Sequence, residues 1–142
     1  MASPPDCIFC AIVDSREPYL SVDEDERTLA FMDIAPANPG HVLVIPKRHS
    51  NDMWDVPEED ALAVMGTALR VARRIQLALD ADGLNLLQAT REAGFQDVFH
   101  FHVHVIPRYH DDAIVPPWPL DHRPGNNEEL RGIAESLRQV TL

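Results

Sequence analysis

Three histidines at alternate positions, His100, His102 and His104, have the spacing in this sequence that points most directly to chemistry. Side chains alternate between the faces of a β-strand, so an extended segment here places the three imidazoles on one face, with neighbours about 6.5 to 7 Å apart. Phe101 and Val103 then lie on the opposite, apolar face. Two chemistries use such a row, namely a zinc site with two histidine ligands and attack by a neutral imidazole on phosphorus. The spacing alone leaves both open.

A second group of chemical interest is the pair Cys7 and Cys10, which are the only two cysteines of the chain. Residues 1–6 have neither the basic nor the apolar region of a secretion signal. A C-x-x-C pair without such a signal indicates metal or redox chemistry rather than a disulfide framework.

Hydrophobic patterning predicts the elements that position these residues. Alternating apolar residues predict a β-hairpin over 19–24 and 28–34, a buried central strand over 41–45, and strands over 84–88 and 99–106. Apolar residues spaced by three and four predict an amphipathic helix of about 23 residues between Pro57 and Gly83. We expect its buried stripe to comprise Leu62, Met65, Leu69, Ala72, Ile75 and Leu79.

These elements predict an α+β fold with one five-stranded antiparallel sheet, one long helix and one short helix that begins at Asn126. At 142 residues the chain is long enough for one core. We expect residues 1–142 to form a single domain, with a core over about 7–110 and a proline-rich tail and C-terminal helix over 111–142.

Charge and hydropathy restrict the partners. With 23 acidic and 12 basic residues, the formal net charge of −11 disfavours extended nucleic acid at long range, whereas one small nucleotide is still compatible. No run of 18 apolar residues occurs, so we expect no membrane partner and a cytoplasmic location.

The segment His100-Phe101-His102-Val103-His104-Val105-Ile106 resembles the His-φ-His-φ-His-φ-φ signature of the histidine-triad (HIT) family, where φ is an apolar residue. The resemblance covers roughly residues 7–110. It extends to Cys7-Ile8-Phe9-Cys10, Ala30-Phe31-Met32-Asp33-Ile34, Pro39-Gly40-His41-Val42-Leu43-Val44-Ile45-Pro46-Lys47, Gly83-Leu84-Asn85 and Ile106-Pro107-Arg108.

What the resemblance implies is a homodimer that binds purine nucleotides and cleaves at the α-phosphate as a hydrolase or nucleotidyl transferase. His102 would attack the phosphorus to form a nucleotidyl-histidine, His104 would hydrogen-bond phosphate oxygens, and Gln96 would face the phosphates or leaving group. Asp33 matches the acid that holds the ribose hydroxyls. The full implied nucleotide site comprises Ile8, Phe9, Phe31, Asp33, Ile34, Asn85, Gln96, Asp97, Val98, His102 and His104.

The C-x-x-C branch of the family also implies a structural zinc ion. A closed Cys₂His₂ set needs two imidazoles besides Cys7 and Cys10, and the resemblance indicates His49 and His100 for them. Two packed thiols without metal are the alternative.

The loop before the triad departs from the family pattern. Ala89 stands where a polar residue is usual, Phe95 replaces a glycine, and Asp97 replaces a serine or threonine. An ionised Asp97 would repel a phosphate unless it caps a loop N–H group instead, and Arg91 could supply a compensating charge. We therefore expect weakened binding of nucleoside monophosphates. A nucleotide-binding sensor or scaffold with weak or lost catalysis is the alternative function, and a catalytic zinc hydrolase is a third.

A tryptophan in the proline-rich tail, Trp118, resembles a C-terminal Trp-Pro region that shapes substrate choice in some branches of the family. It could equally cover an edge of the core.

Overall fold

A computed structural model describes residues 4–116 and 120–142, so Trp118 lies outside the described residues. The chain divides into two compact units, Met1–Asp112 and Ala113–Leu142. The second unit contains helix α3 (Asn127–Arg138), which begins where the sequence predicts because the Asn126 side chain accepts a hydrogen bond from the N–H of Glu129. In the described part of the chain, no helix is both long and apolar enough to span a membrane.

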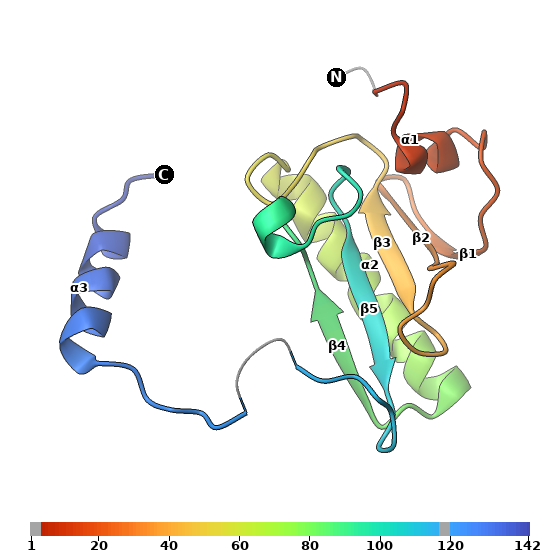
Figure 1. The fold of residues 1–142 in the computed structure, drawn as a ribbon. Coiled ribbons are helices and arrows are strands. Elements are labelled where there is room, and N and C mark those ends of the chain that lie inside the picture. The colour runs from red at the N-terminus through yellow and green to blue at the C-terminus, as the bar shows by residue number, and fades with distance from the viewer. Residues whose placement is uncertain (1–3, 117–119) are drawn as a thin grey trace. The chain divides into compact units, whose positions relative to one another are not determined.

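The first unit is built on one antiparallel sheet of five strands, as the sequence predicts (Figure 1). The strand order is β1-β2-β3-β5-β4. The strands are β1 (Ser21–Glu24), β2 (Thr28–Met32), β3 (Val42–Pro46), β4 (Gly83–Leu87) and β5 (Val103–Arg108).

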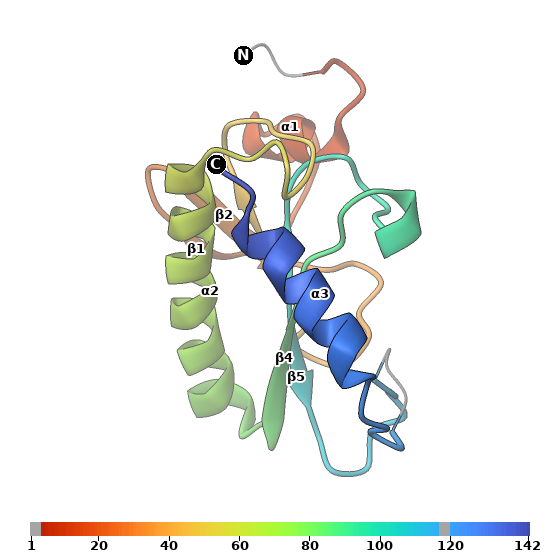
Figure 2. The ribbon, with the colours of Figure 1, turned by 90° about the vertical axis from the view of Figure 1, so that its left-hand side faces the viewer.

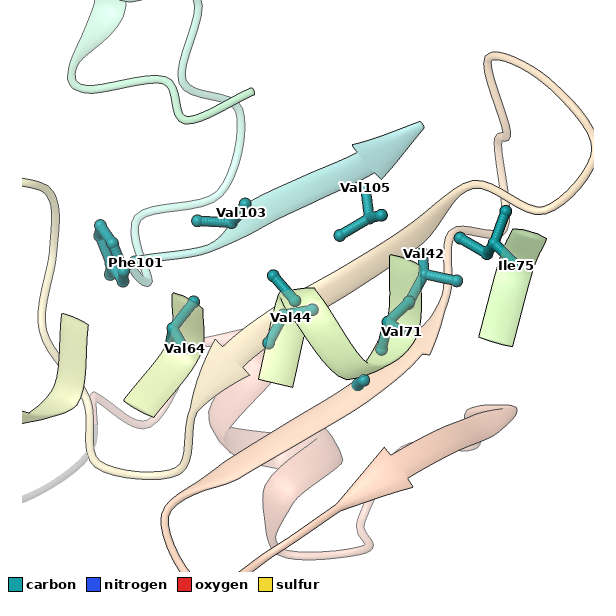
Figure 3. Packing of buried hydrophobic residues seen from close by; sticks show 10 residues of the cluster. Val42, Val44, Val64, Val71, Ile75, Phe101, Val103 and Val105 are labelled. Atoms are coloured by element: carbon teal, nitrogen blue, oxygen red, sulfur yellow. The ribbon is translucent and has the colours of Figure 1, made fainter. Parts of the chain in front are cut away.

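The central strand β3 divides its side chains between two buried layers. Val42 and Val44 point toward helix α2 (Glu58–Leu79), whereas Leu43 and Ile45 point to the other face. Figure 3 shows Val42 and Val44 packed among Phe101 and the other residues of the α2 layer. Both faces of β3 are therefore buried from solvent, as the sequence predicts for the central strand.

Helix α2 runs along one face of the sheet, as Figure 2 shows, but it does not bury the stripe that the sequence analysis assigned. Its buried apolar residues are Val64, Ala68, Val71 and Ile75. Leu62 is 66% exposed, and Met65, Leu69 and Leu79 are also exposed. The prediction was wrong for these four residues because two apolar stripes of the helix share the same spacing. The stripe that faces the sheet consists of smaller Val and Ala side chains together with Ile75.

A short helix, α1 (Ile8–Val13), lies on the opposite face and was not predicted. Its N-terminus is capped by Cys7, whose sulfur accepts a hydrogen bond from the N–H of Cys10. Phe9 and Ile12 pack on the β2 and β3 residues of that face. The C-x-x-C pair is thus part of a helix turn held against the sheet.

The histidine row is only partly in a strand, which corrects the sequence analysis. Strand β5 begins at Val103, so His100 and His102 precede it and only His104 is a strand residue. The alternation of faces nevertheless persists, because Phe101 and Val103 pack in the α2 layer while the histidines point to the α1 face. The alternation at these positions therefore occurs without ladder pairing.

Candidate active site and metal cluster

A cavity of about 450 Å³ opens on the α1 face of the sheet. Its lining is mainly apolar and includes residues of α1 and β2 and two of the triad histidines. Nine of the eleven side chains assigned to nucleotide binding line it, namely Ile8, Phe9, Phe31, Asp33, Ile34, Asp97, Val98, His102 and His104. The fold therefore brings most of the expected site together around one space of nucleotide size.

His102 presents a nucleophilic nitrogen to this cavity. Its Nδ1–H donates to the backbone oxygen of His100 across 2.7 Å, which leaves the lone pair of the neutral ring on Nε2. The ring is almost fully buried and meets Phe9 edge-on, with ring centroids 5.2 Å apart. Nε2 lies 3.5 Å from Oδ1 of Asp97. Backbone and packing together fix the tautomer and the direction of attack.

A chain of hydrogen bonds fixes the proton positions on His104 as well. The backbone N–H of Ala37 donates to Nδ1 of His41 across 3.0 Å, so the neutral ring of His41 has its proton on Nε2. That Nε2–H donates to Nδ1 of His104 across 2.9 Å. His104 consequently has its own proton on Nε2, where it can donate to an anionic oxygen.

Burial keeps these two rings neutral. It lowers the pKa of His104 to about 4, and positive charge on His102 or His41 would lower that pKa further. Burial also lowers the pKa of His41, although the carboxylate of Asp33 opposes the shift. A neutral His41 is the form that the Ala37 contact requires.

His41 is the functional residue that the sequence analysis missed. It lies directly before β3, on the same side as Leu43, which pairs with His104 across the ladder. Strand alternation could have identified it. Residue 41 is two positions from Leu43, so its side chain is expected on the face opposite to Val42 and Val44.

Asp33 lines the cavity with its carboxylate partly buried. Oδ1 accepts a hydrogen bond from the N–H of Ala35, while Oδ2 lies 3.5 Å from Nε2 of His41. A carboxylate at this place can accept hydroxyl donors from a ligand in the cavity.

Two of the assigned residues lie outside the cavity. Gln96 is buried, and its Nε2 donates to the backbone oxygens of Asn51 and Val98 at 2.6 and 3.0 Å. Its Oε1 accepts from the N–H of Arg91. Asn85 lies on β4 and accepts from Arg108. The structure thus gives Gln96 the contacts of a residue that positions the loop, not contacts with the cavity.

Arg91 does not compensate for the charge of the loop. Its Nε donates to Asp52 across 3.1 Å, and its guanidinium lies 4.7 Å from the ring centroid of Trp54. This arrangement ties the loop before the triad to the segment after β3 and pairs the positive charge with Asp52, and Arg91 is not among the residues that line the cavity.

The two other departures in this loop differ in kind. Phe95 adopts a positive φ of 67°, a conformation that favours glycine, and the residue is 88% exposed. It is not among the residues that line the cavity. Asp97 accepts a hydrogen bond from the N–H of Val98 through Oδ1. The expected loop-capping contact and the position beside His102 therefore occur together.

Behind the triad, Cys7, Cys10, His49 and His100 form a cluster that could hold a metal ion. His100 donates through Nε2 to the backbone oxygen of Pro46, and His49 donates through Nε2 to Asn51. The Nδ1 lone pair of His100 thus faces both sulfurs, and that of His49 faces the sulfur of Cys10. Burial also lowers the pKa of His100 to about 4, which keeps this ring in the neutral form that binds metals.

The distances within the cluster fit a tetrahedral ion. Each of the sulfurs lies 3.5 Å from Nδ1 of His100, and Cys10 Sγ lies 3.3 Å from Nδ1 of His49. The two Nδ1 atoms are 3.3 Å apart. Zinc bonds to sulfur and nitrogen in a tetrahedron separate such ligand atoms by roughly 3.3 to 3.6 Å.

Comparison with known proteins agrees with this geometry. The HIT domain family model matches residues 16–111, and the chain belongs to the HIT family. It is similar to a crystal structure of a HIT family protein from Bacillus anthracis, with a TM-score of 0.89, 36% identity, and coverage of 98% of this chain and 100% of that one.

Two further relatives bear on function. A zinc-bound histidine triad family protein from Mycobacterium smegmatis is 38% identical with a TM-score of 0.74, covering 94% of this chain and 96% of that one. The adenosine 5′-monophosphoramidase of Saccharomyces cerevisiae is 35% identical over 80% of this chain and 70% of its own length. The cysteine and histidine cluster is consistent with the C-x-x-C zinc-binding branch.

Proposed function

We propose that this protein cleaves at the α-phosphate of a nucleoside phosphate or adenylated compound through a nucleotidyl-histidine intermediate on His102. The observation that supports it most is the hydrogen bond from Nδ1 of His102 to the His100 carbonyl, which leaves the Nε2 lone pair facing a nucleotide-sized cavity. The yeast relative is named as a phosphoramidase, a class that breaks a P–N bond.

In the proposed reaction, the Nε2 lone pair of His102 forms an N–P bond while the bond from phosphorus to the leaving atom breaks. The leaving atom keeps that electron pair and takes a proton from water. A second water then attacks the phosphorus, returns the lone pair to Nε2 and releases a proton to solvent. His104 donates its Nε2–H to a phosphate oxygen, and Asp33 accepts the ribose hydroxyls.

Trapping the intermediate tests this function. Adenosine 5′-phosphoramidate mixed with an excess of protein and quenched rapidly in alkali should give a protein species heavier by one adenylyl group. His102→Ala should give none, whereas the exposed His110→Ala should behave like the wild type. Turnover of His102→Ala within tenfold of the wild type would overturn the assignment.

The alternative is a nucleotide-binding sensor or scaffold with weak or lost catalysis. The carboxylate of Asp97, with Oδ1 3.5 Å from Nε2 of His102, favours it. In that case the protein binds nucleotides in calorimetry but yields neither the adduct nor turnover.

The cluster of Cys7, Cys10, His49 and His100 is proposed to hold a structural zinc ion. Four protein ligands would close the coordination sphere, so the ion would hold α1 against the sheet rather than take part in the reaction. Thiolate ligands agree with a reducing compartment, and a cytoplasmic location remains a prediction.

A homodimer is proposed on the exposed apolar residues of α2 and β4. Leu62, Met65 and Leu69 of α2 are uncovered, and the edge strand β4 exposes its leucines. An open strand edge can pair with a second copy. Sedimentation analysis should show a dimer for the wild type and a monomer for Met65→Glu. Leu20→Glu, which makes the same kind of change at an exposed residue outside α2 and β4, should remain a dimer. A monomeric wild type would exclude the proposal.

A further inference from the structure

A second cavity, of about 420 Å³, adjoins the candidate nucleotide cavity. The two share Ile8, Asp97 and Val98 as common lining residues. The second cavity extends past α1 to Asp6 and Phe99. If a nucleoside occupies the first cavity, the leaving group of the same substrate has this neighbouring space available.

Asp97 stands at the junction of the two cavities. Oδ1 lies 3.5 Å from Nε2 of His102 and accepts from the N–H of Val98. Within the described residues, Oδ2 of Asp97 has no hydrogen-bond partner, and the side chain is 74% exposed. One carboxylate oxygen is thus held beside the atom that would attack, while the other can meet a ligand.

The charge around both cavities is negative. None of the described residues that line them is a lysine or arginine, whereas Asp6, Glu17, Asp33 and Asp97 all contribute carboxylates. The neighbouring metal cluster would add no net charge, because two thiolates balance one divalent ion. An anionic leaving group such as a polyphosphate would meet repulsion here, and a cationic one would meet attraction.

We propose that Asp97, with Asp6, makes the second cavity a leaving-group site for substrates whose departing amine carries a second, protonated amino group. The proposal rests on the proposed function and names its substrate class. Asp97 is then a specificity residue: it weakens the binding of a free nucleoside monophosphate, whose phosphate would lie beside it, and favours a substrate with a cationic leaving group.

A matched pair of substrates tests the proposal. The phosphoramidates of adenosine 5′-monophosphate with 1,2-diaminoethane and with propylamine have leaving groups of almost the same size, and only the first is charged. For the wild type, kcat/KM should be higher for the aminoethyl compound. Asp97→Asn should reduce that ratio about fivefold, the effect of one exposed ion pair. The ratio should also fall as salt increases.

Three further variants separate the possible outcomes. Asp6→Asn should reduce the ratio in the same direction, and the double variant should reduce it more. Asp80→Asn, which removes a carboxylate at the C-terminus of α2 and outside both cavities, should leave it unchanged. Calorimetry should show tighter binding of AMP to Asp97→Asn than to the wild type.

A ratio in the double variant within a factor of 1.5 of the wild type, with both compounds still hydrolysed, would overturn the proposal and leave the proposed function standing. Failure to hydrolyse either compound, with AMP binding intact, would instead remove the proposed function and this inference together. The two failures are distinguishable because the propylamine compound requires no charge recognition.

Discussion

His41 donates a hydrogen bond through Nε2 to Nδ1 of His104 across 2.9 Å, joining the residue that precedes β3 to strand β5. This contact sets the tautomer of His104. Replacing His41 by Ala should lower kcat/KM for adenosine 5′-phosphoramidate about tenfold or more, because His104 would no longer be held as an Nε2 donor.

The control for that prediction is His41→Gln, whose amide N–H can donate to the same nitrogen. It should retain more activity than His41→Ala, with the loss mainly in kcat rather than KM. Equal loss in both variants, together with equal loss of thermal stability, would show that His41 acts through packing only.

Removing the proposed zinc ion should lower the thermal stability of the fold more than it changes the nucleotide cavity. Protein purified without chelators should contain one zinc ion per chain, and Cys10→Ser should lower the melting temperature by about 5 °C or more. The metal-free protein and the variant should melt alike. Wild-type protein without stoichiometric metal, or a variant that melts like the wild type, would instead support two packed thiols without an ion.

Acidification should reduce the free energy of unfolding through His104. Its pKa is about 4 in the folded protein and about 6.5 when unfolded, so the unfolded state binds the extra proton between these values. Stability from this group is complete above pH 6.5 and is lost as the pH falls toward 4. His102 and His41 add to the shift, whereas Asp33 and Asp97 oppose it.

Urea unfolding at a series of pH values measures this dependence. His104→Gln, which remains neutral, should show a shallower loss of stability between pH 6.5 and 4 than the wild type. Parallel curves for the two proteins would assign the pH dependence to other groups.

The role of Gln96 can be separated from that of the residues in the cavity. Gln96→Ala leaves the oxygens of Asn51 and Val98 without their donor, and we expect a loss of about 1 to 3 kcal/mol in the free energy of unfolding. Gln96→Glu should be at least as destabilising, because a carboxylate would face the two carbonyls. Loss of kcat with unchanged stability would instead indicate direct contact with substrate.

The strand pattern and the family motif predicted much of the site because its histidines occupy alternate positions of an extended segment and so share one face. His102 and His104 reach the cavity, and Asp33 lines it with the apolar residues of β2. Helix α1 escaped prediction because six residues are too few to show helical periodicity. The buried face of α2 was misassigned because hydrophobicity does not distinguish a core stripe from an exposed one, as Leu62 shows.

Loop residues were the hardest to predict. The sequence identifies Gln96 and Arg91 as polar groups near the triad, but not their partners. Those partners, among them Asp52 and the Asn51 carbonyl, come from a segment about 40 residues earlier in the chain. Such contacts depend on how two loops fold over one another, which no local spacing encodes.

Phe95 and Asp97 lie in an exposed loop above a rigid sheet, and neither side chain belongs to the two buried apolar layers. Substitutions at these positions can therefore alter which molecules react while leaving the folded state almost untouched. Because the loop is separate from the core, the loop can change while the core is retained. Members of one family can therefore diverge in substrate choice with little risk of unfolding.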